Sequence, residues 1–254
     1  MAKIATKASI NKIELSVNKV QAIQTTRGFS DKAATALSTF DHFNLGLHVS
    51  DSASSVLANR ENLKNTFPQN TQIQWLEQVH SNNVLITETL ITPYPAADAI
   101  ITHTPNLALA VMTADCLPIL LTSISGKEVA AIHCGWRSTV NNIISHTINK
   151  MTSMPEDIIA WLGPCISQEY FEVGEEVKAA FTKEDFKLAA FFIENSNKKY
   201  QADLSGIAKF LLQKVGVKTI IQSTECTYAN EDKYYSYRRD GVTGRMASVI
   251  YIKE

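Results

Sequence analysis

The chain has 254 residues and a formal net charge of −1, and its hydrophobic and charged residues make up 45% and 19%. This is the composition of an ordinary globular protein that is long enough to form its own core. The balanced charge excludes a general attraction to nucleic acid or to an acidic membrane surface, and no apolar run approaches the ~18 residues that a membrane-spanning helix needs.

In chain order, short apolar runs between turn residues predict buried strands, and helical spacing of apolar residues predicts amphipathic helices. The predicted strands cover 8–25 (one or two strands), 73–76, 84–87, 98–102, 107–113, 117–122, 129–132, 158–162, 217–223 and 246–252, with 187–193 a further candidate. The predicted helices cover 52–67 (capped by Ser50 or Asp51), 138–150 (capped by Ser138 or Thr139), 175–181 and 204–215. This mixture predicts one layered α/β (α+β) domain over residues 1–254, a mixed sheet with flanking helices.

Residues 1–7 contain no apolar signal core, so we expect a cytoplasmic protein. The four cysteines, Cys116, Cys134, Cys165 and Cys226, form no Cys-x-x-Cys pair. In a reducing compartment they are expected to be free thiols or metal ligands.

The central part of the chain, residues 109–137, carries the strongest functional signal. Cys116 lies between two apolar runs, and His133 lies at the end of the next run. His80 follows an earlier predicted strand. Functional side chains are commonly mounted at such strand ends, so these three residues are the first candidates for a site.

Two histidines and one cysteine allow several kinds of chemistry. They can bind zinc and leave the fourth tetrahedral position open, as in catalytic zinc sites, where the pKa of a bound water falls towards ~7. The spacing of His80, Cys116 and His133 matches no short zinc signature. The same residues suit copper. Alternatively, Cys116 is a nucleophile with His133 as its base, or a buried small hydrophobic residue beside ordinary histidines.

Six segments, in order along the chain from about residue 25, resemble one known family. They are Asn44-Leu45-Gly46-Leu47 with Asn59-Arg60, Gln78-Val79-His80, Thr113-Ala114-Asp115-Cys116-Leu117-Pro118, His133-Cys134-Gly135-Trp136-Arg137, Leu162-Gly163-Pro164-Cys165-Ile166, and Ser236-Tyr237-Arg238-Arg239-Asp240-Gly241 with Gly244-Arg245-Met246. Together they resemble the YfiH family, also called the laccase-domain or polyphenol-oxidase family.

The resemblance implies a fold similar to that of the cytotoxic-necrotizing-factor deamidases, which use a Cys-His pair. It implies one zinc ion per chain, bound by His80, Cys116 and His133. It also implies phosphorolysis of adenosine, inosine, guanosine and methylthioadenosine with inorganic phosphate, and deamination of adenosine to inosine. The expected partners are therefore small purine nucleosides and phosphate. An older label for the family is copper-dependent polyphenol oxidase.

The chain departs from the family pattern at three positions. Ser81 stands where the family usually has glycine after the first histidine, Cys134 where it has alanine, and Ser138 where it has glycine. None of these changes removes a ligand. We expect them to reshape the pocket wall slightly, and Cys134 to add a thiol beside His133.

Roles for other residues follow as hypotheses. Asp115 is a candidate acid/base in deamination, against a structural role, because neighbours on a strand point to opposite faces and it reaches the metal only if the chain bends. The candidate residues for binding phosphate or nucleoside are Arg60, Arg137, Arg238 and Asn44, since the arginine fork binds phosphate bidentately. The alternative for each arginine is a surface or structural ion pair. Trp136, Cys165 and Cys226 are expected to be packing residues.

Three other function classes stay open. A thiol hydrolase or deamidase using Cys116 and His133 would survive chelation but not alkylation. A copper oxidase fits less well, because a single three-ligand site lacks the several coppers that four-electron reduction of oxygen normally uses. A non-catalytic binding protein would hold neither metal nor nucleoside.

Overall fold

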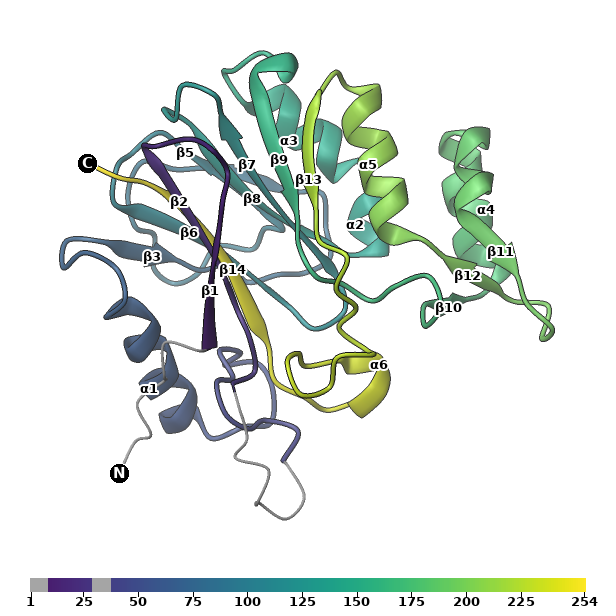
Figure 1. Ribbon diagram of the computed structural model, residues 1–254, viewed down its shortest axis with the longest axis horizontal. Helices are drawn as coiled ribbons and strands as arrows, with labels where there is room; N and C mark the ends of the chain where they lie inside the picture. The colour runs from purple at the N-terminus through teal and green to yellow at the C-terminus, as the bar shows by residue number, and fades with distance from the viewer. Residues whose placement is uncertain (1–8, 29–37) are drawn as a thin grey trace.

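The computed structural model describes residues 9–28 and 38–254, so residue 8 of the first predicted strand region lies outside it. Its centre is a pair of stacked sheets (Figure 1). The five-stranded sheet has the order β1 (Ile10–Ile13), β2 (Val20–Thr25), β14 (Met246–Ile252), β6 (Leu107–Thr113) and β3 (Gln72–Gln74). The six-stranded sheet has the order β13 (Thr219–Gln222), β9 (Ile158–Leu162), β7 (Leu117–Ser123), β8 (Val129–Cys134), β5 (Ala99–Thr102) and β4 (Val84–Ile86).

Both sheets are mixed, and their central strands are buried on both faces. In β6, Leu107, Leu109 and Val111 pack between the two sheets, whereas Ala108 and Ala110 pack on the opposite face. This alternation follows from the two-residue period of a strand. Burial on both faces explains why these strands read as unbroken apolar runs in the sequence.

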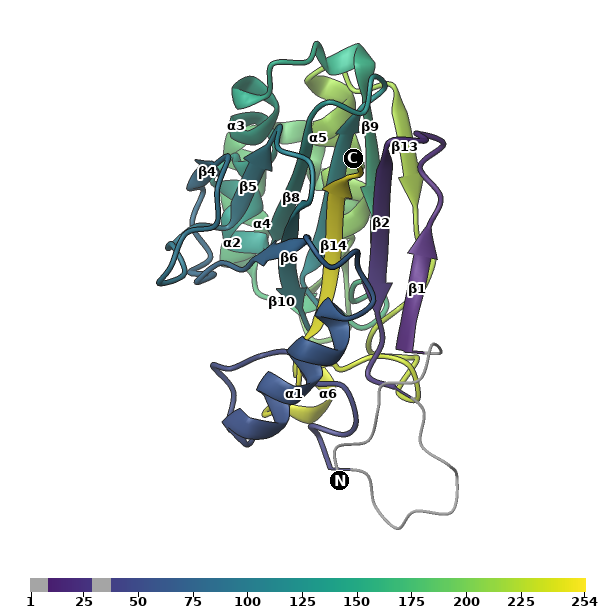
Figure 2. The same cartoon turned by 90° about the vertical axis from the view of Figure 1, so that its left-hand side faces the viewer.

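Helices pack against both sheets. The helix α1 (Ala53–Lys64) buries Leu63 against the outer face of the five-stranded sheet. The helices α3 (Ile143–Lys150) and α5 (Leu204–Lys214) cover the six-stranded sheet. Figure 2 shows α1 at the lower end of the strands and α3 and α5 on the other side. The prediction of a layered α/β fold with flanking helices is confirmed, and two stacked mixed sheets replace the single sheet that was expected.

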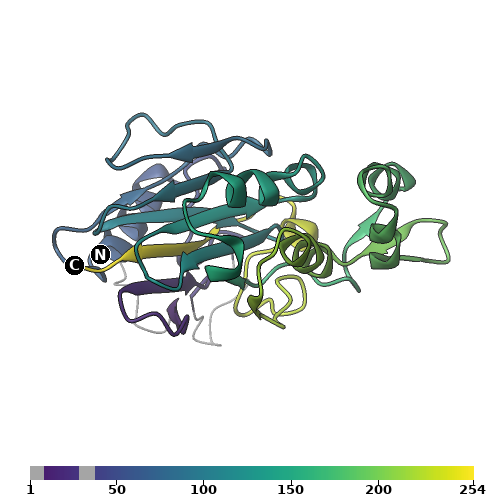
Figure 3. The same ribbon diagram turned by 90° about the horizontal axis from the view of Figure 1, so that it is seen from above.

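A third, small sheet stands to one side of the stack (Figure 3). It consists of β10 (Glu172–Val173), β12 (Tyr200–Ala202) and β11 (Phe192–Glu194), and α4 (Glu175–Glu184) packs on it. The expected strand at 187–193 is wrong for most of its length. A short 3-10 helix over Phe186–Phe191 precedes β11, because Asp185 caps it by accepting a hydrogen bond from the Lys187 N–H.

Two predicted helices differ from those observed. The helix expected at 138–150 is broken into α2 (Trp136–Val140) and α3, since Asn142 adopts a left-handed conformation with φ of 66°. Its cap is therefore Gly135 and not Ser138 or Thr139. The first helix begins after Ser52, not Ser50 or Asp51, and ends at Lys64. Within the described ranges, no helix is long and apolar enough to cross a bilayer.

Candidate functional site

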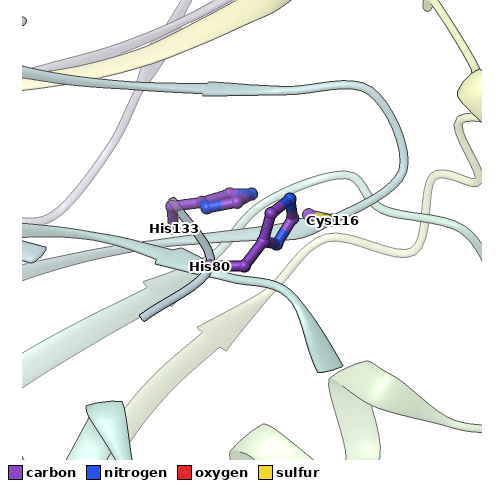
Figure 4. Close-up of side chains that lie close together, drawn as sticks. All are labelled: His80, Cys116 and His133. Carbon is purple, nitrogen blue, oxygen red and sulfur yellow. The ribbon is translucent and has the colours of Figure 1, made fainter. Parts of the chain in front are cut away.

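Three segments that are distant in the sequence bring His80, Cys116 and His133 together (Figure 4). Their ligand atoms all lie within 4.8 Å of one another, and the two imidazole rings meet edge to face with centroids 4.8 Å apart. The pairing of β7 with β8 causes part of this, because Leu117 lies opposite Cys134 in that register. The end of β8 therefore meets the segment that begins β7.

The buried carboxylate of Asp98 positions two of the three clustered side chains. Its Oδ1 accepts a 2.8 Å hydrogen bond from His133 Nδ1 and a 3.0 Å bond from the His80 N–H. Its Oδ2 accepts bonds from the N–H and hydroxyl groups of Ser81 at 2.6 and 2.9 Å. These bonds fix the loop that carries His80 and leave Nε2 of His133 facing the cluster. Metal-binding histidines are typically oriented by a carboxylate in this way.

Gly135 makes room for the cluster. A Cβ atom at this position would lie 2.8 Å from His80 Nδ1 and 3.2 Å from Cys116 Sγ. Two imidazoles, one thiol and the free space that Gly135 leaves beside them fit a small cation such as zinc or copper. In the described part of the chain, no other set of three metal-ligating side chains lies this close together.

The electrostatic surroundings differ between the two histidines. Burial and then the neighbouring His133 lower the pKa of His80, which favours the neutral imidazole that a metal needs. Burial on its own would lower the pKa of His133, but Cys116 and Asp98 raise it. For Asp98, burial opposes ionisation, yet hydrogen bonds from His133 and Ser81 lower its pKa overall. Asp98 is therefore an ionised acceptor at neutral pH.

The cluster lies in the wall of a cavity of about 470 Å³, a size typical of small-molecule sites. The cavity combines apolar side chains with several cationic ones, so it suits a ligand with both an apolar ring and an anionic group. Its lining comprises His48, Gln78, His80, Met112, Thr113, Ala114, Asp115, Cys116, His133, Trp136, Arg137, Ile166, Phe171, Leu204, Tyr237, Arg238 and Arg245.

Asp115 lies at the bend that its candidate role required, with a φ of 94°. Both of its carboxylate oxygens are engaged. Oδ1 accepts a 2.6 Å bond from the Thr227 hydroxyl, and Oδ2 accepts bonds from the Ser236 hydroxyl and the Arg238 N–H at 3.0 and 2.7 Å. The acid/base role stays a prediction, and these bonds favour the structural alternative, in which Asp115 holds the C-terminal segment against the cavity.

The structure does not bring Asn44 and Arg60 into the cavity lining. Asn44 is fully buried, and its Oδ1 accepts hydrogen bonds from the N–H groups of Gly46 and Arg245, both at 2.9 Å. Arg60 donates through Nε to Leu45 O at 2.9 Å, and its guanidinium stacks 4.1 Å from the Trp75 ring centre. Both residues support the cavity wall from behind, which is a physical reason to look elsewhere for direct substrate contacts.

Arg137 and Arg238 do line the cavity, and both are exposed at its mouth. The Arg137 guanidinium lies 4.4 Å from the ring centre of Trp136, which is itself partly exposed to the cavity. Trp136 therefore forms part of the cavity wall in addition to its packing role.

Sequence reasoning missed Asp98, His48 and Arg245. Asp98 follows two alanines and directly precedes an apolar strand. Nothing in its neighbouring sequence predicts that it contacts the histidines. Arg245 lies inside a segment that had been matched to the family, Gly244-Arg245-Met246, so that match could have identified it. His48 follows directly on another such segment.

The three departures from the family pattern have separate outcomes. Ser81 adds a hydroxyl hydrogen bond to Asp98. Cys134 does not add a thiol to the site, because strand alternation points it into the helix-covered core, where its Sγ lies 3.0 Å from Thr139 Oγ1. Burial raises its pKa to about 12. Ser138 is fully buried, and its hydroxyl has no hydrogen-bond partner among the described residues.

Comparison with known proteins gives consistent results. Residues 22–253 match the family described as multi-copper polyphenol oxidoreductase laccase. The purine nucleoside phosphorylase YfiH of Escherichia coli is 42% identical over 219 residues, which cover 85% of this chain and 89% of that protein. A purine nucleoside phosphorylase of Haemophilus influenzae is 39% identical over 240 residues, which cover 92% of this chain and 95% of that protein. A crystal structure of a Neisseria meningitidis protein superposes with a TM-score of 0.90 at 35% identity. The superposition covers 97% of this chain and 100% of that one.

Proposed function

The chain belongs to the family of multi-copper polyphenol oxidoreductase laccase domains, also known as the YfiH family, and we propose that it is a purine nucleoside phosphorylase. The observation that carries the proposal is the His80–Cys116–His133 cluster in the wall of a cavity that also presents arginines. The names of the curated relatives support the same activity.

In phosphorolysis, a phosphate oxygen forms a bond to ribose C1′ while the bond from C1′ to the purine nitrogen breaks. The electron pair of that bond goes to the purine, which takes up a proton. The protein must therefore hold an anion beside C1′ and stabilise negative charge on the departing base. Buried cationic groups and hydrogen-bond donors stabilise such charge because they are already oriented before the reaction.

We propose zinc as the bound metal, one ion per chain, held by His80, Cys116 and His133. Two imidazoles and a thiolate would supply three protein ligands, the number typical of catalytic zinc sites. When bound, the ion supplies a positive charge that polarises the substrate or a water molecule. Asp98 keeps His133 in the tautomer that presents Nε2. Trp136 and Phe171 offer apolar surface for the purine, and Arg137 offers donors to the substrate at the mouth.

We further propose that adenosine, inosine, guanosine and methylthioadenosine are substrates, and that the protein also deaminates adenosine. The size of the cavity, about 470 Å³, supports both, because it is typical of small-molecule sites. Asp115 is the candidate proton carrier for deamination. If Asp115→Asn kept full deaminase activity in a protein of unchanged stability, that role would be dropped.

The test is metal analysis of the wild type and of Cys116→Ala, together with adenosine and inosine turnover with and without phosphate. We expect about one zinc per chain in the wild type, phosphate-dependent release of adenine and hypoxanthine, and loss of metal and both products in the variant. Copper in place of zinc would redirect attention to oxidation, and a metal-free, inactive protein would contradict the proposal.

One observation favours a second candidate. His133 Nδ1 lies 2.8 Å from Asp98 Oδ1, and a nitrogen of the same ring lies within 4.8 Å of Cys116 Sγ, an order that resembles a nucleophile–base–acid triad. A thiol hydrolase or deamidase of this kind would keep its activity after removal of metal by a chelator and lose it on alkylation of Cys116. The zinc enzyme would lose activity on chelation and regain it when zinc is returned.

A further inference from the structure

Four arginines lie in or beside the cavity, and their surroundings distinguish them. Arg60 lies behind the wall, where Nε and Nη1 donate to Leu45 O and the Tyr94 hydroxyl. Arg238 is exposed, and its Nη1 and Nη2 both donate to backbone carbonyls at the rim. Arg137 is exposed over Trp136. Arg245 is the one arginine of the described lining that is not exposed.

The Arg245 guanidinium is held in place with donors to spare. Its Nη1 donates to the carbonyls of Thr243 and Gly244 at 2.8 and 3.0 Å. In the part of the chain that the structure describes, its Nε and Nη2 have no hydrogen-bond acceptor, and no carboxylate lies within ion-pair distance. A half-buried cation with free donors and no anionic partner favours an anionic ligand.

The loop over residues 44–46 holds the backbone of Arg245 in place. The N–H of Arg245 donates to Asn44 Oδ1 at 2.9 Å, and the Leu45 N–H donates to the Arg245 carbonyl at 3.1 Å. Gly46 leaves space for the side chain, since a Cβ there would lie only 2.8 Å from Arg245 Cγ. The loop over residues 44–46 therefore positions Arg245, and the same loop continues to His48.

His48 faces the same part of the cavity. Its ring has no hydrogen-bond partner within residues 9–28 and 38–254. His48 is an exposed residue, but partial desolvation of its ring, and after it the charge of Arg245, lowers its pKa, so the imidazole is neutral at neutral pH and can donate one N–H. Arg245 and His48 line the same cavity as His80, Cys116 and His133, so both lie near the cluster.

We propose that Arg245 and His48 form the phosphate subsite of the reaction, beside the His80–Cys116–His133 cluster, with Asn44 and Gly46 as positioning residues. The assignment rests on the proposed phosphorylase function. Arg245 binds two phosphate oxygens through Nε and Nη2, and His48 donates to a third. The geometry thereby puts the attacking oxygen next to the metal-binding wall, while the arginines at the mouth contact other parts of the substrate.

The experiment measures inosine phosphorolysis at varied phosphate for the wild type, Arg245→Gln and Arg245→Lys. For Arg245→Gln we expect the KM for phosphate to rise about ten- to hundredfold, with the KM for inosine and the metal content unchanged. Arg245→Lys keeps the charge but not the fork, so its KM should lie in between. Lys12→Gln on the distant strand β1 removes one positive charge and is the matched control.

Direct titration with inorganic phosphate, followed by calorimetry, separates this subsite from the proposed function. If wild-type protein binds phosphate and Arg245→Gln does not, while neither cleaves nucleosides, the subsite stands and the phosphorylase proposal fails. If the wild type cleaves inosine and Arg245→Gln keeps its KM for phosphate, the subsite is overturned and the function stands.

A phosphate group could also arrive as part of a nucleotide, and inosine 5′-monophosphate tests that source. If Arg245→Gln weakens inhibition by the nucleotide but leaves the KM for inorganic phosphate unchanged, the subsite holds a phosphate ester and our assignment is wrong. The melting temperature of each variant, and the intermediate variant Arg245→Lys, show whether a loss reflects the subsite or a folding defect.

Discussion

The antiparallel strands β5 and β8 carry a carboxylate–histidine pair at each end. At one end, Asp98 precedes β5 and binds His133, near the end of β8, at 2.8 Å. At the other end, Glu128 precedes β8 and lies 3.1 Å from His103, which follows β5. In both pairs the carboxylate is almost completely buried and also accepts backbone N–H bonds from a neighbouring loop.

The two pairs differ in what the second ring nitrogen meets. The second nitrogen of His133 faces Cys116 and His80, whereas that of His103 lies 2.7 Å from a second carboxylate, Glu88. The first arrangement suits a metal ion and the second an ion pair. The same carboxylate–histidine pair therefore forms a candidate metal site in one case and a structural ion pair in the other. The neighbour of the second ring nitrogen makes the difference.

The largest expected effect is on metal binding and activity, and it comes from removing the thiol of Cys116 next to the Asp98–His133 pair. Cys116→Ala should lose bound metal and phosphorolysis, because two imidazoles alone bind a divalent ion weakly. Metal analysis of the purified protein and an inosine assay measure this. Cys134→Ala is the control, since this thiol belongs to the core on the opposite face of β8. It should keep its metal, and equal metal loss in both variants would contradict the assignment.

The next effect tests the carboxylates themselves. Asp98→Asn should weaken zinc binding about 10- to 100-fold, because the amide orients His133 less well and cannot accept every bond made to the carboxylate. Competition with a chromogenic chelator measures the affinity. Glu128→Gln makes the same kind of change at the other end and should leave zinc affinity unchanged. If both variants bound zinc like the wild type, Asp98 would have no role in orienting the ligands.

A smaller effect is expected at Ser81, where the chain departs from the family pattern. Ser81→Gly removes one hydrogen bond to Asp98 and should lower zinc affinity about threefold, without changing the number of ions bound. An increase in affinity would mean that the hydroxyl competes with His133 for the carboxylate. The same chelator competition resolves the difference.

The smallest effect concerns the pH dependence of stability at the second end. The hydrogen bond with Glu88 raises the pKa of His103, so its contribution to the unfolding free energy is complete below about pH 6.5 and is lost as the pH rises through the raised pKa. His103→Gln should therefore destabilise the protein by less than about 1 kcal/mol, more at pH 6 than at pH 9, because water screens this partly exposed pair. Urea unfolding at the two pH values measures the difference, and a larger loss at pH 9 would contradict it.

The strands predicted best from the sequence were those buried on both faces. The bounds of β6, β9 and β14 agree with the predicted ranges, because a continuous apolar run between turn residues marks where such a strand begins and ends. The break between α2 and α3 was not predicted, since Asn142 bends the chain without glycine or proline.

The candidate site was only partly accessible from the sequence. His80, Cys116 and His133 were site candidates from their positions at predicted strand ends, and the family resemblance implied that they bind zinc. Their spacing alone was uninformative. Asp98 was invisible because its partner His133 is 35 residues away and nothing local marks the contact. Arg245 and Asn44 meet through a hydrogen bond between segments 201 residues apart, so only the folded chain distinguishes a cavity arginine from one behind the wall.

The central place of β14 bears on how the protein is made. This strand follows all the others in the chain, yet it lies between β2 and β6 in the middle of its sheet. Synthesis proceeds from the N-terminus at ~5–20 residues per second, so β2 and β6 leave the ribosome before the strand that separates them exists. His80, Cys116 and His133 are likewise translated well before Arg245, which directly precedes β14. A nascent chain could therefore assemble the ligand cluster early, while completion of the cavity must await the last strand.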